Sequence, residues 1–255
     1  MSTIPSSKPA LETILNHRSI RKFTEQPISE ELLRTLFEAG MAGSSSGFLQ
    51  SASIIRVTDK QLRYEIRRIC ADAQDAKEGE KYGHPYVEHC GELLIYCMDN
   101  QRHLQVVPNA QIDWTEVTLV GAIDSAIMAQ NLLVAAESLG LGGVYLGSVR
   151  NDINRLSELL QLPAGVVPMF GMALGYPDQD PAMRPRLPVE LVVSTNKFES
   201  ASKEAVEAYN DTMKAYYVER GQPGMDWTKQ VMNYLDKPAR PAILPYLNKQ
   251  GYAKR

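Results

Sequence analysis

One long apolar segment constrains the fold more than any other feature of this sequence. Residues 116–139 read EVTLVGAIDSAIMAQNLLVAAESL, and the glycine-rich residues 140–143 follow. The segment predicts one helix of roughly 36 Å at 1.5 Å per residue, stopped by glycine as helices commonly are. A helix that is apolar almost all round is buried, so we expect it at the centre of a domain or in a dimer interface. Its polar exceptions are Asp124, Gln130, Asn131 and Glu137.

The remaining segments predict strands and helices around this central element. Ser29 is a good N-cap for a helix that we expect to end at Gly40, and residues 92–99 form an apolar run of strand length, typical of a strand buried on both faces. Residues 60–90 begin with a helical pattern and continue into a charged insertion. The pattern favours an α+β or α/β domain with a helix-covered sheet. Further helices are expected at 11–16, at 152–162, from about 200 and at 226–236, and further strands at 53–59, 144–149 and 166–177.

Composition argues against several classes of protein. The formal net charge of −3 provides no global field that would attract nucleic acid or an anionic membrane. The three cysteines form no C-x-x-C pair, which favours a reducing compartment over a disulfide scaffold. The N-terminus has no apolar signal region, and no run of about 20 uncharged apolar residues predicts a membrane span. We therefore expect a cytoplasmic protein.

The sequence contains none of the common cofactor-binding, metal-binding or catalytic motifs in the context that each requires. The glycines at 140–147 follow a helix and precede a strand, whereas the dinucleotide-binding fingerprint requires the opposite order. His84, His89 and Cys90 match no standard zinc spacing, so no metal is expected. Cys97 lies within an apolar strand, where a thiol usually acts as a small hydrophobic side chain.

Two clusters of basic residues remain as candidate anion sites. They are HRSIRKF at 17–23 and MRPRLP at 183–188. Arginine suits phosphate because its planar guanidinium donates two parallel hydrogen bonds. From composition alone, each cluster taken singly is therefore interpreted as solvated surface.

Several motifs, in a fixed order, carry a resemblance to a known family. They are ETILNHRSIRKFTEQPIS, SSSGFLQSASIIRVTD, AAESLGLGGVYLGSVRNDI and FGMALGYP followed by RPRLP. In this order and spacing they resemble the FMN-dependent nitroreductase family, in particular its oxygen-insensitive NADPH nitroreductase A and flavin reductase group. The resemblance extends from about residue 11 to the C-terminus.

The resemblance implies a fold and an activity. The implied fold is α+β, with a central mixed sheet surrounded by helices, in an intertwined homodimer that holds FMN at its interface. The whole chain, 1–255, would be one domain with a C-terminal helical extension from about residue 200. The implied enzyme is an NAD(P)H-dependent nitroreductase or flavin reductase, which reduces nitroaromatics, quinones or free flavin by a ping-pong two-electron mechanism. A flavin-binding storage or sensing protein without turnover is the alternative, and a nucleic-acid binder is disfavoured by the net charge.

The resemblance also assigns site residues. The HRSxR motif implies contacts with FMN from His17, Arg18, Ser19 and Arg21. Ser45 would contact the FMN of the partner subunit, Tyr145, Leu146, Gly147 and Ser148 would flank its ring, and Arg184 and Arg186 would lie near its phosphate. Phe48 would lie on the substrate side, and Arg220 and Arg240 correspond to basic positions associated with NADPH. No protein general base is implied.

Three positions depart from the family pattern. Arg184 replaces a lysine, which changes a point charge into a planar fork. Ser148 replaces a glycine, which alters how closely the backbone can approach the flavin. His84 stands where the family has a flavin-contacting glutamine, after an apparent insertion of about ten residues, and would bring a titratable group to the flavin edge.

Overall fold

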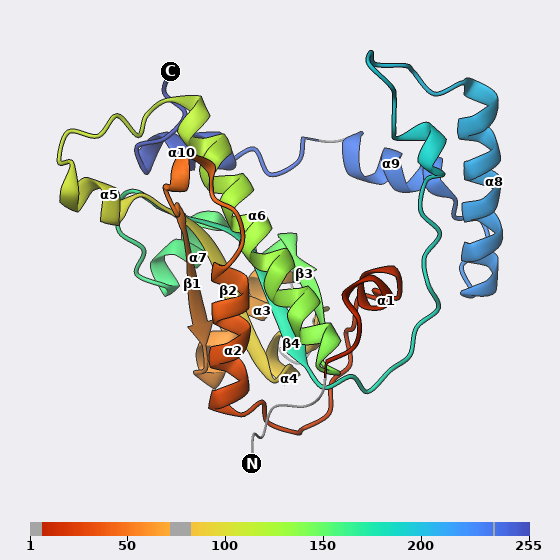
Figure 1. Ribbon diagram of the computed structural model, residues 1–255, viewed down its shortest axis with the longest axis horizontal. Helices are drawn as coiled ribbons and strands as arrows, with labels where there is room; N and C mark the ends of the chain where they lie inside the picture. The colour runs from red at the N-terminus through yellow and green to blue at the C-terminus, as the bar shows by residue number, and fades with distance from the viewer. Residues whose placement is uncertain (1–6, 72–82, 237) are drawn as a thin grey trace. The chain divides into compact units, whose positions relative to one another are not determined.

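The computed structural model describes residues 7–71, 83–236 and 238–255. The chain forms two compact units (Figure 1). Unit 1 comprises Met1–Pro181 and Arg240–Arg255, and unit 2 comprises Ala182–Ala239. The expectation that 1–255 is one domain stays a prediction. The charged insertion expected after residue 71 lies almost wholly outside the described residues.

A four-stranded sheet with strand order β1-β2-β4-β3 forms the middle of unit 1. Every pairing among the described strands is antiparallel, so the expectation of a mixed sheet was wrong. The reason is topological: β4 inserts between β2 and β3, and these two strands of the same direction are therefore not neighbours. The expectation that 92–99 is buried on both faces is confirmed by β2. The strands are β1 (Ala52–Val57), β2 (Glu92–Asp99), β3 (Gly142–Leu146) and β4 (Val166–Gly175).

Helices cover both faces of this sheet. On one face, α2 (Glu30–Met41) and α6 (Thr115–Ser138) pack against each other and against β2 and β4 (Figure 1). Side chains of α3 (Lys60–Cys70), α4 (Tyr86–His89) and α7 (Ile153–Leu159) pack in a second cluster of buried residues on the opposite face. Alternation of side chains along the strands separates the two clusters: Leu93, Ile95 and Cys97 belong to the second, and Leu94 and Tyr96 to the first. Unit 1 also contains α1 (Ala10–Leu15), α5 (Gln101–Val106), α10 (Ile243–Lys249) and the 3₁₀ helices η1 (Ser46–Phe48) and η3 (Gly147–Arg150).

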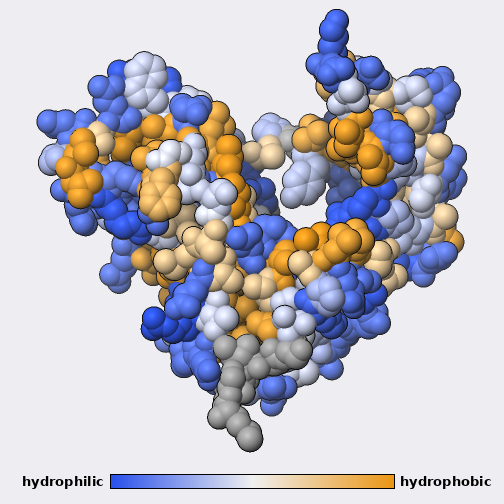
Figure 2. Space-filling model, viewed as in Figure 1, coloured by the Kyte–Doolittle hydropathy of each residue, from blue (hydrophilic) through white to orange (hydrophobic). Residues whose placement is uncertain are grey.

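The long apolar helix expected at 116–139 is confirmed by α6. Its C-terminal half is core, since Leu132, Leu133 and Ala136 are fully buried. Its N-terminal half differs, because Leu119 and Ile123 are 52% and 54% exposed. By length and composition alone α6 would qualify as a membrane span, but much of it packs on the sheet. The space-filling view shows hydrophobic surface over this face of the molecule (Figure 2).

One local expectation for the N-terminal helices was wrong. Ser29 caps α2 by accepting a hydrogen bond from the Leu32 amide at 3.2 Å, as expected, but Gly40 does not end this helix, which continues to Met41. A Cβ at Gly40 would lie 3.2 Å from the Leu132 Cβ, so this glycine serves the close packing of α2 on α6. In α1 the apolar side chains of Leu11, Ile14 and Leu15 are exposed, and Thr13 is the buried residue.

Unit 2 contains η4 (Val189–Leu191), α8 (Lys203–Glu219) and α9 (Trp227–Leu235). Both α helices begin at a polar N-cap: the Ser202 hydroxyl accepts from the Ala205 amide, and the Asp226 carboxylate accepts from the Lys229 amide. The unit has its own cluster of buried side chains, Tyr209, Met213, Tyr216 and Tyr217. The helices expected from about 200 and at 226–236 are confirmed.

Candidate functional site

The HRSIRKF segment lies beside β3 and the end of β4. The amide of Ile20 donates to the Gly143 carbonyl at 3.0 Å, and the amide of Thr24 donates to the Tyr176 carbonyl at 2.9 Å. This close approach depends on a glycine in β3, because a Cβ at Gly142 would lie only 2.6 Å from the Ile20 Cγ1. Motifs more than 100 residues apart are thus joined by backbone hydrogen bonds.

His17 is held by a carboxylate of the long helix α6. Its Nδ1 lies 2.6 Å from Oε1 of Glu137, and the two side chains are 24% and 11% exposed. The Oε2 atom of Glu137 is buried and has no hydrogen-bond partner within the described part of the chain. Burial raises the pKa of Tyr145, and the charge of Glu137 raises it further. Glu137 therefore acts on His17 and on Tyr145, which belong to two segments predicted to contact FMN. The resemblance assigned Glu137 itself no role.

The arginines of the segment point to an anionic ligand. Arg18 forms an ion pair with Asp180, but its Nε is buried without a hydrogen-bond partner among the described residues. Arg18 also lines a cavity of about 520 Å³, whose other charged residues are Lys8 and the carboxylates Glu12, Glu137 and Asp180. The Arg21 side chain is exposed, and no ion pair engages it within the described ranges. An unsatisfied buried donor and an exposed cation fit a phosphate-bearing group such as FMN.

His84 lies near the same segment. Its Nδ1 is 2.5 Å from the Tyr86 hydroxyl, and the two rings meet edge to face with centroids 5.4 Å apart. Burial lowers the pKa of His84, and the charges of Arg21 and Arg67 lower it further. The charge of Arg21 thus acts on His84, and the lowered pKa favours its neutral imidazole. The place of His84 at the flavin edge stays a prediction.

The predicted ring-flanking residues form the β3–η3 turn. The Tyr145 hydroxyl donates to Gln130 Oε1 at 3.1 Å, Leu146 is buried, and Gly147 and Ser148 are half-buried. Arg240 lies at the end of this turn, where its Nε donates to Asn151 Oδ1 at 3.0 Å.

Ser45 and Phe48 lie elsewhere on unit 1. The Ser45 hydroxyl donates to Asp124 Oδ2 at 2.7 Å, and Asp124 is 13 residues from Glu137 along α6, a rise of about 20 Å. Phe48 is 79% exposed and has a φ of 56°. A left-handed conformation at a bulky residue costs about 1–3 kcal/mol and is often found at functional sites.

The remaining predicted arginines belong to unit 2. The Arg184 guanidinium lies 5.9 Å from the centroid of the Tyr216 ring, and that of Arg220 lies 5.6 Å from it, within cation–π range. Arg220 Nη1 also donates to the Tyr216 hydroxyl at 2.8 Å. Partial burial raises the pKa of Tyr216, but hydrogen bonds from Arg220 and Arg184 and their charges outweigh it, so the net shift is downward. Arg186 is exposed. The predicted assembly of Arg184 and Arg186 with Arg18 and Arg21 stays a prediction, because these pairs lie in different units.

Comparison with known proteins covers nearly the whole chain. Residues 14–176 match the model of the nitroreductase family, and residues 184–255 match that of the nitroreductase family C-terminal domain. The chain is 47% identical to the NADPH-flavin oxidoreductase of Vibrio harveyi, over 96% of this chain and 98% of that protein. It is 41% identical to the oxygen-insensitive NADPH nitroreductase of Salmonella typhimurium, over 97% and 99% of the two chains.

Solved structures agree with these matches. The crystal structure of nitroreductase A from Vibrio parahaemolyticus superposes with a TM-score of 0.89 at 46% identity, over 96% of this chain and 98% of that one. The α+β fold and the order of the motifs both agree with this relationship. The chain belongs to the nitroreductase family.

Proposed function

We propose that this protein is an FMN-dependent NADPH oxidoreductase that reduces nitroaromatics, quinones or free flavin. The observation that carries this proposal is the convergence of the HRSIRKF segment, His84 and the β3–η3 turn in unit 1. In the part of the chain that the structure describes, the Arg18 Nε has no hydrogen-bond partner. The relatives support it, since their names state NADPH as the donor and flavin or nitro compounds as the acceptor. A storage or sensing protein has no need of an exposed aromatic such as Phe48, so that alternative is not favoured.

Each residue group has a physical task in this proposal. Arg18 and Arg21 offset the charge of the FMN phosphate, and Glu137 orients His17 toward the same group. The β3–η3 turn supplies backbone beside the flavin ring, and neutral His84 supplies a hydrogen bond at its edge. Held by these residues, FMN would supply the redox chemistry, which is hydride acceptance from NADPH and two-electron transfer to the acceptor. The protein binds, orients and excludes water, and no side chain needs to act as general base.

We further propose that the enzyme is a homodimer in which Ser45 reaches the FMN of the partner subunit. Support comes from the separation along α6: Ser45 is anchored at Asp124, about 20 Å of helix rise from the Glu137–His17 pair. The exposed Leu119 and Ile123 would also be covered by a second copy.

A cytoplasmic location belongs to the same proposal. The three cysteines are buried and unpaired, and burial raises the pKa of the Cys70 thiol to about 11 and that of Cys97 to about 12. Such thiols stay protonated at neutral pH, as suits a structural cysteine in a reducing compartment.

Anaerobic stopped-flow spectroscopy tests the function directly. The purified FMN-loaded protein is mixed with NADPH or with NADH, and the flavin absorbance near 450 nm is followed before a nitroaromatic or quinone is added. We expect rapid bleaching by NADPH, slower bleaching by NADH, and recovery of the absorbance on addition of the acceptor. Bound FMN that neither nucleotide reduces would instead indicate the storage or sensing protein.

A further inference from the structure

The segment 45–53 adopts an unusually strained conformation. Gly47, Phe48 and Gln50 all have positive φ, at 55°, 56° and 53°. Two of these three residues carry side chains that disfavour this region of backbone conformation. Such strain persists only where the surroundings hold the chain in place, and the contacts of the segment identify what holds it.

The first anchor is Asp124, a carboxylate that is 3% exposed in the largely apolar α6. Its Oδ2 accepts from the Ser45 hydroxyl at 2.7 Å and from the Ser51 amide at 3.1 Å, and its Oδ1 accepts from the Ser46 amide at 3.1 Å. The Ser45 hydroxyl in turn accepts from the Gln50 amide at 2.6 Å. One buried carboxylate thus ties together both ends of the strained turn around Phe48.

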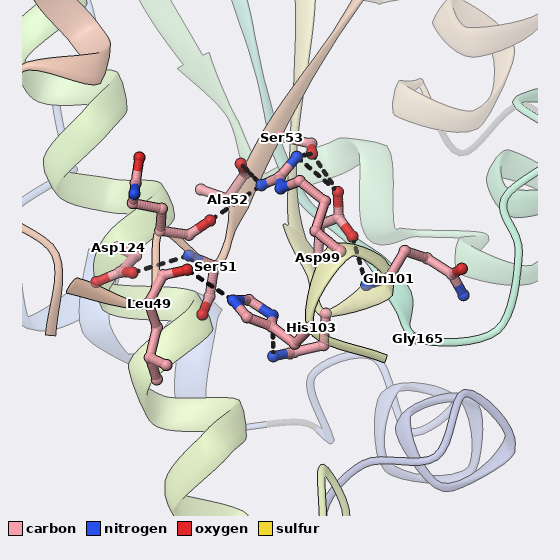
Figure 3. A network of polar contacts seen from close by, with 12 residues as sticks. Leu49, Ser51, Ala52, Ser53, Asp99, Gln101, His103, Asp124 and Gly165 are labelled. Atoms are coloured by element: carbon pink, nitrogen blue, oxygen red, sulfur yellow. Dashed lines mark hydrogen bonds and ion pairs between the residues drawn. The ribbon is translucent and has the colours of Figure 1, made fainter. Parts of the chain in front are cut away.

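The second anchor is α5, on the other side of the segment (Figure 3). His103 Nε2 donates to the Leu49 carbonyl at 2.6 Å, while its Nδ1 accepts from the Asn100 amide group at 2.9 Å. This pair of contacts corresponds to the neutral ring with its proton on Nε2.

Arg102 adds further contacts from the same helix. Its guanidinium donates to the Gln50 and Ala52 carbonyls at 2.9 and 2.8 Å and to the Ser53 hydroxyl at 3.0 Å. Its own position is fixed by an ion pair with Asp99 at 3.2 Å. Three carbonyls of the segment, those of Leu49, Gln50 and Ala52, therefore accept hydrogen bonds from α5.

These anchors border a cavity of about 810 Å³. Ser45, Leu49, Asp124, Arg102 and His103 all contribute to its lining. The volume is in the range of sites for small organic molecules. The residues that fix the segment therefore lie beside a space large enough for an aromatic compound.

We propose that Asp124, Arg102 and His103 are positioning residues that fix Phe48, and that they thereby determine how well the enzyme discriminates aromatic electron acceptors. The inference rests on the proposed function, because it takes Phe48 as the aromatic on the substrate side. A platform fixed by two anchors presents its ring in one place, and a loss of either anchor lets the strained turn relax and moves the ring.

Asp124→Asn removes the charge of the first anchor and places amide protons against its donors. We expect the KM for a nitrobenzoate to rise about 10-fold, since displacement of a positioning group by about 1 Å is enough for such an effect. Because Ser45 also faces the cofactor in the proposed dimer, both assays are run with FMN in saturating excess. The kcat with ferricyanide, which has no ring to stack, then stays at the wild-type level. Asp59→Asn is the matched control, because Asp59 caps α3 and accepts from the Leu62 amide at 2.7 Å. This variant should keep the wild-type kcat and KM with both nitrobenzoate and ferricyanide.

A double-mutant cycle separates positioning from general destabilisation. If Asp124 acts through Phe48, Asp124→Asn combined with Phe48→Ala raises the KM for nitrobenzoate no more than Phe48→Ala alone. Additive effects, equal losses with both acceptors, or an unchanged KM in Asp124→Asn would each overturn the inference. Arg102→Gln repeats the comparison of nitrobenzoate with ferricyanide at the second anchor. Because the Arg102 side chain is 53% exposed, this substitution should leave the fold intact.

Hydrogen exchange of the peptide 43–53 provides a readout without turnover. Asp124→Asn should accelerate its exchange, whereas Asp59→Asn should not, and equal protection in wild type and Asp124→Asn would refute the anchoring itself. A wild-type protein that reduces neither acceptor would refute the proposed function, while the exchange result would stand separately.

Discussion

Glu137 is the residue whose importance the structure adds to the sequence. In the sequence it is one of four polar interruptions of an apolar helix; in the structure its carboxylate meets His17 at 2.6 Å, across 120 positions of the chain. Charge-assisted hydrogen bonds of this kind are stronger than neutral ones. Asp124 belongs to the same class, and both residues show that a charged side chain in a buried helix indicates a specific partner.

Glu137→Gln should weaken FMN binding by about 10-fold, because the amide keeps an acceptor for His17 but loses the charge-assisted part of the bond. The measurement is a fluorescence titration of the FMN-free protein with FMN. The ¹⁵N chemical shifts of His17 provide a second readout, since they report which ring nitrogen carries the proton.

The control for this variant is Glu38→Gln. Glu38 forms an ion pair with Arg34 at 2.9 Å on the exposed side of α2, where a pair contributes little. Wild-type affinity for FMN in Glu137→Gln would contradict a role for this carboxylate.

At the scale of elements, β3 is the point where the motifs meet. Its glycines did not fit a dinucleotide fingerprint, and the structure supplies their physical reason: Gly142 lets Ile20 approach, and a Cβ at Gly143 would lie 2.9 Å from the Leu133 Cδ1 of α6. The glycines thus serve close packing on both sides of one strand. In consequence, the position of the HRSIRKF segment depends on a strand that is not adjacent to it in sequence.

Gly142→Ala should destabilise the fold by about 1–3 kcal/mol, the usual cost of overpacking, and should weaken FMN binding because Ile20 must move. Thermal unfolding and the FMN titration measure the two effects. Gly83→Ala is the matched control, since a Cβ there meets nothing within 4 Å. A Gly142→Ala variant that matches the control in both measurements would contradict this prediction. It would show that the close approach of Ile20 to Gly142 affects neither the stability nor the affinity for FMN.

At the scale of the whole molecule, α6 serves both as core and as surface. Its second half fills the centre of unit 1, while Leu119 and Ile123 of its first half are about half exposed. The sequence predicted a buried helix, at the centre of a domain or in a dimer interface. The part that unit 1 leaves uncovered is the part that a second subunit would bury in the proposed homodimer.

Leu119→Asp combined with Ile123→Asp should therefore convert the dimer into a monomer, because two desolvated carboxylates in an apolar interface are costly. Analytical ultracentrifugation of wild type and variant measures the change. Val218→Asp in α8, with a comparable exposure of 53%, should leave the assembly unchanged. A wild-type protein that sediments as a monomer would refute the homodimer.

The sequence alone determined the features that depend on local physics. The helix cap at Ser29, the buried strand at 92–99 and the long apolar helix all follow from residue type and hydrophobic period. The order of the motifs was sufficient to indicate the family, the cofactor and the residues that would hold it, because such motifs keep their spacing in the chain.

Only the tertiary structure decided what depends on distant partners. It inserted β4 between β2 and β3, which made an antiparallel sheet of an expected mixed one. It placed Glu137 at His17 and Asp124 at Ser45, and it gathered Arg184 and Arg220 at Tyr216 in unit 2. No local pattern encodes these contacts, because strand order and the pairing of buried charges are set by the packing of the whole chain rather than by the residues on either side.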